Sequence, residues 1–244
     1  MRDLYLGEAW RCSLDLEARA EAAGFRPTLY VASAGLGLRD ANDEAPAYAA
    51  TFTAGQDDSV AESDAEARDW WAAMCAGGDY PGLAGLPKRP TLVVLSAAYG
   101  KPLSADLAAL AATNPDVLVV GGTGPVPGAT RIAADRSLRA ELGGSVMSLN
   151  QRMAGAWLDR LAGRALNSAD AIADWSSWSA KVQQVETWDR RTMTDEMVVR
   201  AVTTMLQDNA RLSWSPALRI LRESGYACEQ KRFKHLFSIA VRAN

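Results

Sequence analysis

The chain has 244 residues, of which 48% are hydrophobic, and a formal net charge of −3. This size supports one large domain, alone or with a small appendage, and the charge excludes a protein held on nucleic acid by its overall balance. No basic-then-apolar leader and no apolar run of membrane-spanning length occur, so we expect a soluble protein without membrane contact. The three cysteines have no zinc-like or disulfide spacing, which favours the cytoplasm.

Helical and strand patterns alternate along residues 1–165. Leucine and alanine at helical spacing predict an amphipathic helix over 3–24, and the apolar run at 28–33 predicts a buried parallel strand. In chain order, the other predicted elements are a helix over 63–76, a strand over 91–96, a helix over 104–113, a strand over 117–121, a short strand near 131–133, and helices over 136–142 and 150–161. The alternation predicts an α/β fold with a mainly parallel sheet flanked by helices.

The pattern changes after residue 165. Residues 166–190 are polar and rich in tryptophan (Trp175, Trp178 and Trp188), which predicts a linker or a helix that docks two parts of the chain. Residues 191–244 predict a helical element with a helix over 194–209, a second that begins at Ser215-Pro216 and ends at Gly225, and a basic helix over 228–241. The last two helices and their glycine turn are typical of a helix-turn-helix, although a plain helical cap has the same pattern.

Charge is distributed unevenly along the chain. Residues 40–69 hold nine acids against one base, whereas residues 211–244 hold seven bases against two acids. This asymmetry predicts an acidic front and a carboxy-terminal element that binds polyanions, although ordinary solvated faces would look the same. The basic residues expected to contact DNA are Arg219, Arg222, Lys231, Arg232 and Lys234.

Small and polar residues follow three predicted strands at the point where each strand ends. Ser33-Ala34-Gly35 follows the first, Ser96-Ala97 follows the strand over 91–96, and glycines follow the third. Because ligands of open α/β sheets gather at the carboxyl ends of strands, we expect these ends to form one pocket. Its candidate residues are Ser33, Asp40, Asn42, Asp43, Glu44, Tyr48, Ser96, Tyr99 and Asn150.

The residue types narrow the chemistry. The single histidine, His235, lies in the carboxy-terminal helix, which excludes a Ser-His-Asp or Cys-His site and a histidine metal site in the α/β part. The sequence GGTGPVPG at 121–128 lacks the lysine of a P-loop and the GxGxxG spacing, so no cofactor and no metal is required. A carboxylate can stabilise a cation or position water, an asparagine can read a base edge, and a tyrosine can stack on a base.

This set of side chains suits cleavage of an N-glycosidic bond, because its oxocarbenium-like transition state needs a nearby anion more than a strong base. Lys101, which follows Tyr99-Gly100, is either a Schiff-base lysine for an abasic sugar, a phosphate contact or a surface lysine. The alternative for the acidic loop is a solvated turn.

The stretch SAGLGLRDANDEAPAYAATF resembles the SAGYGL-loop-Pro-x-Tyr-x-x-TF signature of the YaaA-like family. Trp70-Trp71, LVVLSAAYGK and GGSVMSLNQRMAGAWL resemble the same family, and the resemblance covers about residues 3–162. Relatives begin with a strand that carries a Ser/Lys motif before the RDLYLGE-like helix, so no role of that motif is carried over. The signature positions are Ser33, Gly35, Gly37, Asp40, Asp43, Pro46 and Tyr48.

The resemblance implies a fold similar to uracil-DNA glycosylases and an activity on DNA. Its sharpest form is a DNA glycosylase that flips a modified base out of DNA and leaves an abasic site; some proteins of this kind remove glucosylated hydroxymethylcytosine from phage DNA in antiviral defence. Asp43, then Asp40, is the candidate for the carboxylate that stabilises the sugar cation. Asn42 or Asn150 would read the base. The alternatives are a non-enzymatic DNA-binding stress protein, a base transferase, and a regulator with a small-molecule pocket.

Overall fold

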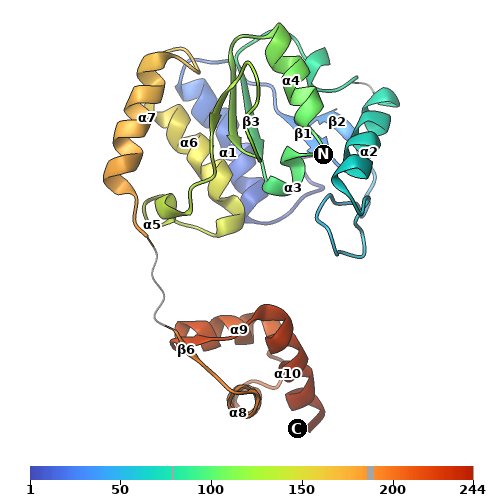
Figure 1. Cartoon of the computed structure of the whole chain (residues 1–244), viewed down its shortest axis with the longest axis vertical. Coiled ribbons are helices and arrows are strands. Elements are labelled where there is room, and N and C mark those ends of the chain that lie inside the picture. Colours follow the sequence, from blue (N-terminus) through green and yellow to red (C-terminus); the bar gives the residue numbers. More distant parts are fainter. Residues whose placement is uncertain (79, 186–189, 244) are drawn as a thin grey trace. The chain divides into compact units, whose positions relative to one another are not determined.

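The structure is a computed structural model that describes residues 1–78, 80–185 and 190–243 (Figure 1). The chain forms two compact units, Met1–Val185 and Glu186–Asn244, and each is described by itself. Trp188, a tryptophan of the predicted linker, lies outside the described residues.

The first unit is built on a three-stranded parallel sheet in the order β3-β4-β5. Its strands are β3 (Thr91–Leu95), β4 (Val117–Gly121) and β5 (Thr130–Ile132), with Thr91 opposite Val117 and Leu118 opposite Thr130. All residues of β4 are buried, as expected for a central parallel strand covered on both faces. The α/β class and these three strands confirm the prediction.

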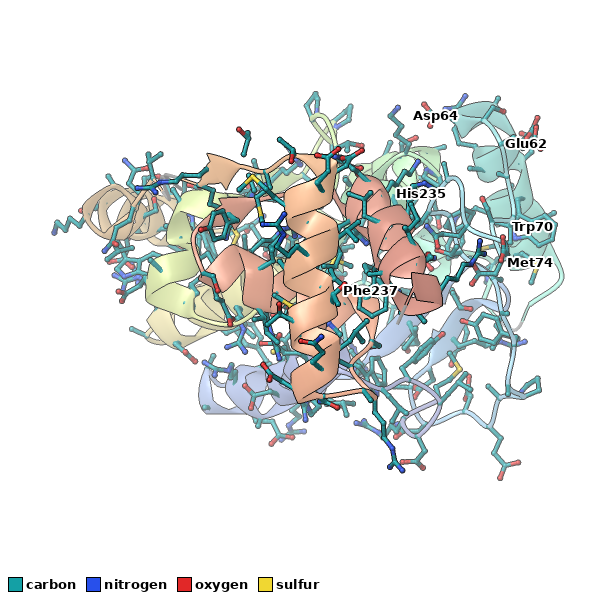
Figure 2. All side chains as sticks on the ribbon, turned by 90° about the horizontal axis from the view of Figure 1, so that it is seen from below. Glu62, Asp64, Trp70, Met74, His235 and Phe237 are labelled. Atoms are coloured by element: carbon teal, nitrogen blue, oxygen red, sulfur yellow. The ribbon has the colours of Figure 1, made fainter. Side chains whose placement is uncertain are left out.

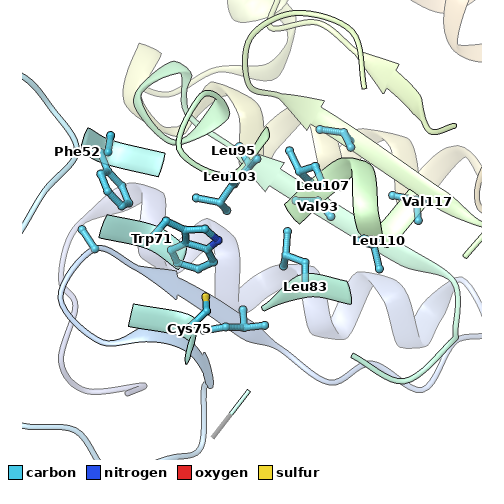
Figure 3. Packing of buried hydrophobic residues seen from close by; sticks show 14 residues of the cluster. Phe52, Trp71, Cys75, Leu83, Val93, Leu95, Leu103, Leu107, Leu110 and Val117 are labelled. Carbon is cyan, nitrogen blue, oxygen red and sulfur yellow. The ribbon is translucent and has the colours of Figure 1, made fainter. Parts of the chain in front are cut away.

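Alternate side chains of β4 enter two separate cores. Val117 and Val119 face a core shared with α2 (Asp64–Ala76) and α4 (Ser104–Thr113), shown in Figure 3. Leu118 and Val120 face a second core, which is covered by α1 (Glu8–Ala22), α6 (Leu149–Arg160) and α7 (Ala169–Val182). The period-2 alternation of a strand thus requires helices on both sides of the sheet.

The predicted helices are largely confirmed, with one difference at the amino terminus. Ser63 caps α2 by accepting a hydrogen bond from the Glu66 N–H, as its position before the helix suggests. The first helix begins at Glu8 and not at residue 3, because Arg2 and Tyr5 make hydrogen bonds to distant segments. The short elements are η1 (Leu83–Gly85), α3 (Ala97–Gly100), η2 (Arg136–Leu138), α5 (Arg139–Leu142) and η3 (Val146–Ser148).

The predicted linker or docking segment contains α7, which packs within the first unit. Trp175 is buried in the second core, where its ring centroid lies 5.5 Å from that of Trp157 and 4.9 Å from that of Trp178. Beyond the end of α7, the Gln184 N–H donates to the Ser137 carbonyl.

The prediction of a buried parallel strand over 28–33 is wrong. The segment forms β1 (Tyr30–Ser33), which pairs antiparallel with β2 (Gly37–Asp40) in a hairpin. The chain reverses because Ser33 Oγ accepts the N–H groups of Gly35 and Leu36, at 3.2 and 3.0 Å. Tyr30 therefore lies opposite Asp40, and Ser33 lies opposite Gly37.

The second unit contains two short parallel strands and three helices. In chain order these are β6 (Arg191–Thr192), α8 (Asp195–Asp208), α9 (Trp214–Glu223), β7 (Tyr226–Ala227) and α10 (Gln230–Ala243). Val198, Val202, Leu221 and Phe233 lie in a core of this unit alone. The three predicted helices are confirmed, but α9 begins at Trp214, so Pro216 is its third residue. Proline is tolerated there because the first-turn N–H groups have no partner in the helix.

The carboxyl ends of β3 and β4 are held together around Gly121. The Leu95 carbonyl accepts the Gly122 N–H at 2.9 Å and Asn150 Nδ2 at 2.7 Å. Gly121 has a φ of +84°, and a Cβ on it would lie 2.1 Å from the Leu95 oxygen and 2.3 Å from Asn150 Nδ2. Only glycine fits at this position.

Gly121→Ala therefore tests the close approach, with Gly124→Ala as its matched control. Gly124 also has a positive φ, of +69°, but no atom lies within 4 Å of the added Cβ. We expect the control to lose about 1 kcal/mol of unfolding free energy and Gly121→Ala at least about 2 kcal/mol more, since it adds a steric clash. Urea denaturation followed by tryptophan fluorescence measures both. Equal losses would contradict the packing argument.

Candidate functional site

Three hydroxyl groups from separate segments form a chain of hydrogen bonds at the carboxyl end of β1. Tyr48 Oη is hydrogen-bonded to both Ser33 Oγ and Tyr5 Oη. Ser33 is buried, and the two tyrosines are partly buried. The sequence predicts Ser33 and Tyr48 as site residues, but no motif marks Tyr5, which falls in the segment predicted as helix. These three residues are called the hydroxyl cluster below.

Aromatic rings and a glycine surround the hydroxyl cluster. A Cβ on Gly35 would lie 2.4 Å from a ring carbon of Tyr48, so the ring reaches Ser33 only because residue 35 is glycine. The ring of Tyr5 lies 5.1 Å from that of Trp10 and meets the ring of Tyr48 edge-on. The site is therefore an aromatic surface with a line of hydroxyl groups in it.

Tyr99 lies beside this cluster, and burial keeps its phenol neutral. Its hydroxyl is hydrogen-bonded to the backbone of Ala34, and burial raises the pKa of Tyr99 to about 12. Burial, with the hydrogen bond to Tyr48, also raises the pKa of Tyr5 well above its ordinary value. Both phenols are therefore protonated hydrogen-bond donors at neutral pH.

The acidic loop lies at the other end of the hairpin. Asp40 is paired with Tyr30, three residues before Ser33, which corresponds to about 10 Å along a strand. The expectation that strand end and acidic loop form one pocket is therefore wrong, because the chain reverses between them.

The carboxylates of this loop hold its turn. Asp40 Oδ1 accepts hydrogen bonds from the N–H and Nδ2 of Asn42, at 2.8 and 2.9 Å. Asp43 Oδ2 accepts the Asp40 N–H at 3.1 Å. Arg2 donates to Asn42 Oδ1 at 2.9 Å and pairs with Glu17 at 2.6 Å. Glu44, the last predicted acid, is exposed.

The other predicted pocket residues are divided between exposed and structural positions. Ser96 is exposed before α3, and Lys101 Nζ forms an exposed ion pair with Asp64 at 2.5 Å. Asn150 does not offer its amide N–H groups to a ligand as predicted, because Nδ2 holds α6 to the Leu95 carbonyl. Gly37 pairs with Ser33 in the hairpin.

The segment between the hydroxyl cluster and α1 is anchored by Glu8. Its carboxylate accepts the Ser145 N–H at 3.1 Å and pairs with Arg152 at 2.5 Å. The hydrogen bonds from Ser145 and Arg152 lower the pKa of Glu8 to about 2. This pair links the amino terminus, which carries Tyr5, to the first turn of α6.

In the second unit, α10 carries a basic exposed face. Lys231, Lys234, His235 and Arg242 are exposed at spacings of three, one and seven residues, which places them on one side of the helix. His235 lies opposite Phe237, which packs in the core, because two successive residues along a helix turn it by about 200° (Figure 2). Lys234 Nζ lies 5.5 Å from the centre of the Trp214 ring.

The five predicted DNA contacts separate into two groups. Arg219, Lys231 and Lys234 are exposed. Arg232 instead bonds Asp195 Oδ1 at 2.5 Å and the Met193 carbonyl at 2.8 Å, which holds α10 against α8. The guanidinium of Arg222 donates to the Cys228 carbonyl at 3.0 Å.

The two units also differ in net charge. Residues 186–244 contain ten Lys and Arg against seven Asp and Glu, whereas residues 1–185 contain sixteen against twenty-two. The overall charge of −3 thus combines an acidic first unit with a basic second unit.

Comparison with known proteins found no matching family model, curated protein or solved structure. Within the described ranges, no group of three or more His, Cys, Asp and Glu side chains could hold a metal ion. In that same part of the chain, none of the helices combines the length and apolar character needed to cross a bilayer. Two shallow grooves lie between α1 and α6, and residues of the hydroxyl cluster line neither of them.

We expect Glu8→Gln to destabilise the protein in a pH-dependent way. Because the pKa of Glu8 is lowered in the folded state, its stabilisation is fully present above pH 4.5 and disappears as the pH falls toward 2. The variant should therefore unfold at a lower urea concentration than the wild type at pH 7, and at nearly the same concentration near pH 2. In an Arg152→Gln background the difference at pH 7 should shrink. A difference that is constant with pH would contradict this assignment.

Proposed function

We propose that this protein acts on DNA, with the second unit binding the duplex and the first unit removing a modified base as a DNA glycosylase. The observation that carries the proposal is the basic face of α10, which is exposed within an otherwise acidic protein. DNA binding depends on cations that neutralise phosphates, and these cations lie on one side of one helix.

The geometry of α10 suits a groove of duplex DNA. The helix has 14 residues, and the major groove is about 12 Å wide, enough to admit an α-helix. Lys231 and Lys234 lie in its first half, while Arg242 lies near its end. The hydrogen bonds of Arg232 to Asp195 and Met193 fix the helix on the rest of the unit, so the exposed face is presented rigidly.

The base-removing activity is supported by the resemblance of residues 33–52 to the YaaA-like signature and by the neutral phenols beside Ser33. A tyrosine ring can stack on a flipped base while its hydroxyl donates to the base edge. Asp43 is our first candidate for the carboxylate near the sugar cation, because the Asp40 N–H orients its side chain. Asp40 is the second candidate.

A non-enzymatic DNA-binding protein is the second candidate function. The observation that favours it is the position of Asp40 and Asp43, which hold the turn of their own loop at the far end of the hairpin from Ser33. This alternative gives DNA binding with the same salt dependence and no cleavage of any bond.

We expect the double variant Lys231→Gln/Lys234→Gln to bind duplex DNA at least about tenfold more weakly than the wild type in 100 mM salt. The slope of log K against log salt should fall by about 2, because two phosphate contacts are lost. Fluorescence anisotropy with a labelled 20-base-pair duplex measures both. The control, Lys88→Gln/Lys181→Gln, removes the same charge from exposed positions of the first unit and should bind normally. Equal loss in both variants would show that only net charge matters.

We expect abasic sites in only one of three DNAs incubated with the protein: unmodified, uracil-containing, or phage DNA with glucosylated hydroxymethylcytosine. Alkali then converts each abasic site into a strand break that a gel resolves. Asp43→Asn should reduce the breaks at least about 100-fold while DNA binding is kept, whereas Asp58→Asn, an exposed acid, should not. DNA that is bound but unbroken in all three cases would favour the non-enzymatic protein.

A further inference from the structure

The hydroxyl cluster has one proton more than its internal hydrogen bonds use. Ser33 Oγ accepts two backbone N–H groups, from Gly35 and Leu36, which occupy both of its lone pairs. Its own proton must therefore be donated to Tyr48 Oη. The remaining hydrogen bond joins two phenols, Tyr48 and Tyr5, which together carry two protons. One phenolic proton is left over.

The direction of the chain assigns this proton to Tyr5. In the order Ser33 to Tyr48 to Tyr5, each phenolic oxygen accepts one hydrogen bond and passes one on, and donors in such a chain polarise one another. Tyr5 then stands at the end with its O–H directed out of the cluster. Within the part of the chain that the structure describes, no acceptor for this proton is present.

The surroundings of Tyr5 suit a planar acceptor. Its ring is partly buried between the rings of Trp10 and Tyr48, and Tyr99 lies on the other side of Ser33. The lowered water content of such a site strengthens a hydrogen bond to a ligand. Because burial keeps the phenol protonated at neutral pH, Tyr5 donates and does not accept.

We propose that Tyr5 donates its spare proton to the ring carbonyl oxygen of a pyrimidine base, with Ser33 and Tyr48 as positioning residues. This inference rests on the proposed function and names the class of base. When the C1′–N1 bond of a pyrimidine nucleotide breaks, its electron pair goes to the base and is shared with the O2 oxygen beside N1. A donor at O2 stabilises that charge. Water forms the new bond to C1′, and the proton it loses ends on the base.

The test uses the full chain labelled with 13C at the ζ carbon of tyrosine, which reports on the phenolic hydroxyl by NMR. The probes are the free bases cytosine, 5-hydroxymethylcytosine and uracil. The matched control ligands are pyrimidine, which lacks the carbonyl, and adenine. Tyr5→Phe assigns the Tyr5 signal and removes the donor. Tyr30→Phe is the control variant, because Tyr30 packs against Tyr80 away from the cluster.

We expect at least one carbonyl-bearing pyrimidine to shift the Tyr5 signal and not that of Tyr30, while pyrimidine and adenine do not. Tyr5→Phe should weaken its binding about tenfold, the loss of one hydrogen bond, and Tyr30→Phe should not. The inference is overturned if no base binds, if adenine binds in place of pyrimidines, or if Tyr5→Phe binds as the wild type. Abasic sites formed in the DNA assay together with any of these results would overturn the inference alone and leave the glycosylase proposal standing.

Discussion

The burial of β4 on both faces is the constraint on which the first unit depends. Each side chain of a fully buried Val or Leu contributes about 1.5–3 kcal/mol when it leaves water, so neither face of this strand can be left open. The chain meets this demand with α2 and α4 on one side and with α1, α6 and α7 on the other. The three tryptophans that pack in the second core bring the segment after residue 165 into the same unit.

The reversal of the chain after Ser33 decides what chemistry the first unit can offer. Ser33 accepts two N–H groups in a tight turn, and the returning strand carries Asp40 away from the strand end. The same turn leaves room at Gly35 for the Tyr48 ring, so hydroxyl groups occupy the place where carboxylates were expected. Neutral donors in partly buried surroundings are suited to stabilise a departing base, whereas a carboxylate is suited to the sugar cation.

The second unit shows how a protein with a net negative charge can present a cationic surface. Arg222 and Arg232 are used within the unit, where they bond carbonyl oxygens and Asp195. Lys231, Lys234 and Arg242 are left on the outer side of α10, and the Phe233 side of the helix is buried in the core. A helix needs only its apolar stripe for packing, so its opposite face is available for a ligand.

The sequence by itself determined the elements whose signals are local. The strands β3 and β4 and the helices α2, α4, α6 and α8 follow from hydrophobic period, and Ser63 and Thr194 cap their helices as such residues do. Only the tertiary structure decided which side chains meet: that Tyr5 joins Tyr48, that Asn150 serves the Leu95 carbonyl, and that Arg232 holds Asp195. These contacts join residues 37 to 55 positions apart, and periodicity within one element carries no information about a partner so distant along the chain.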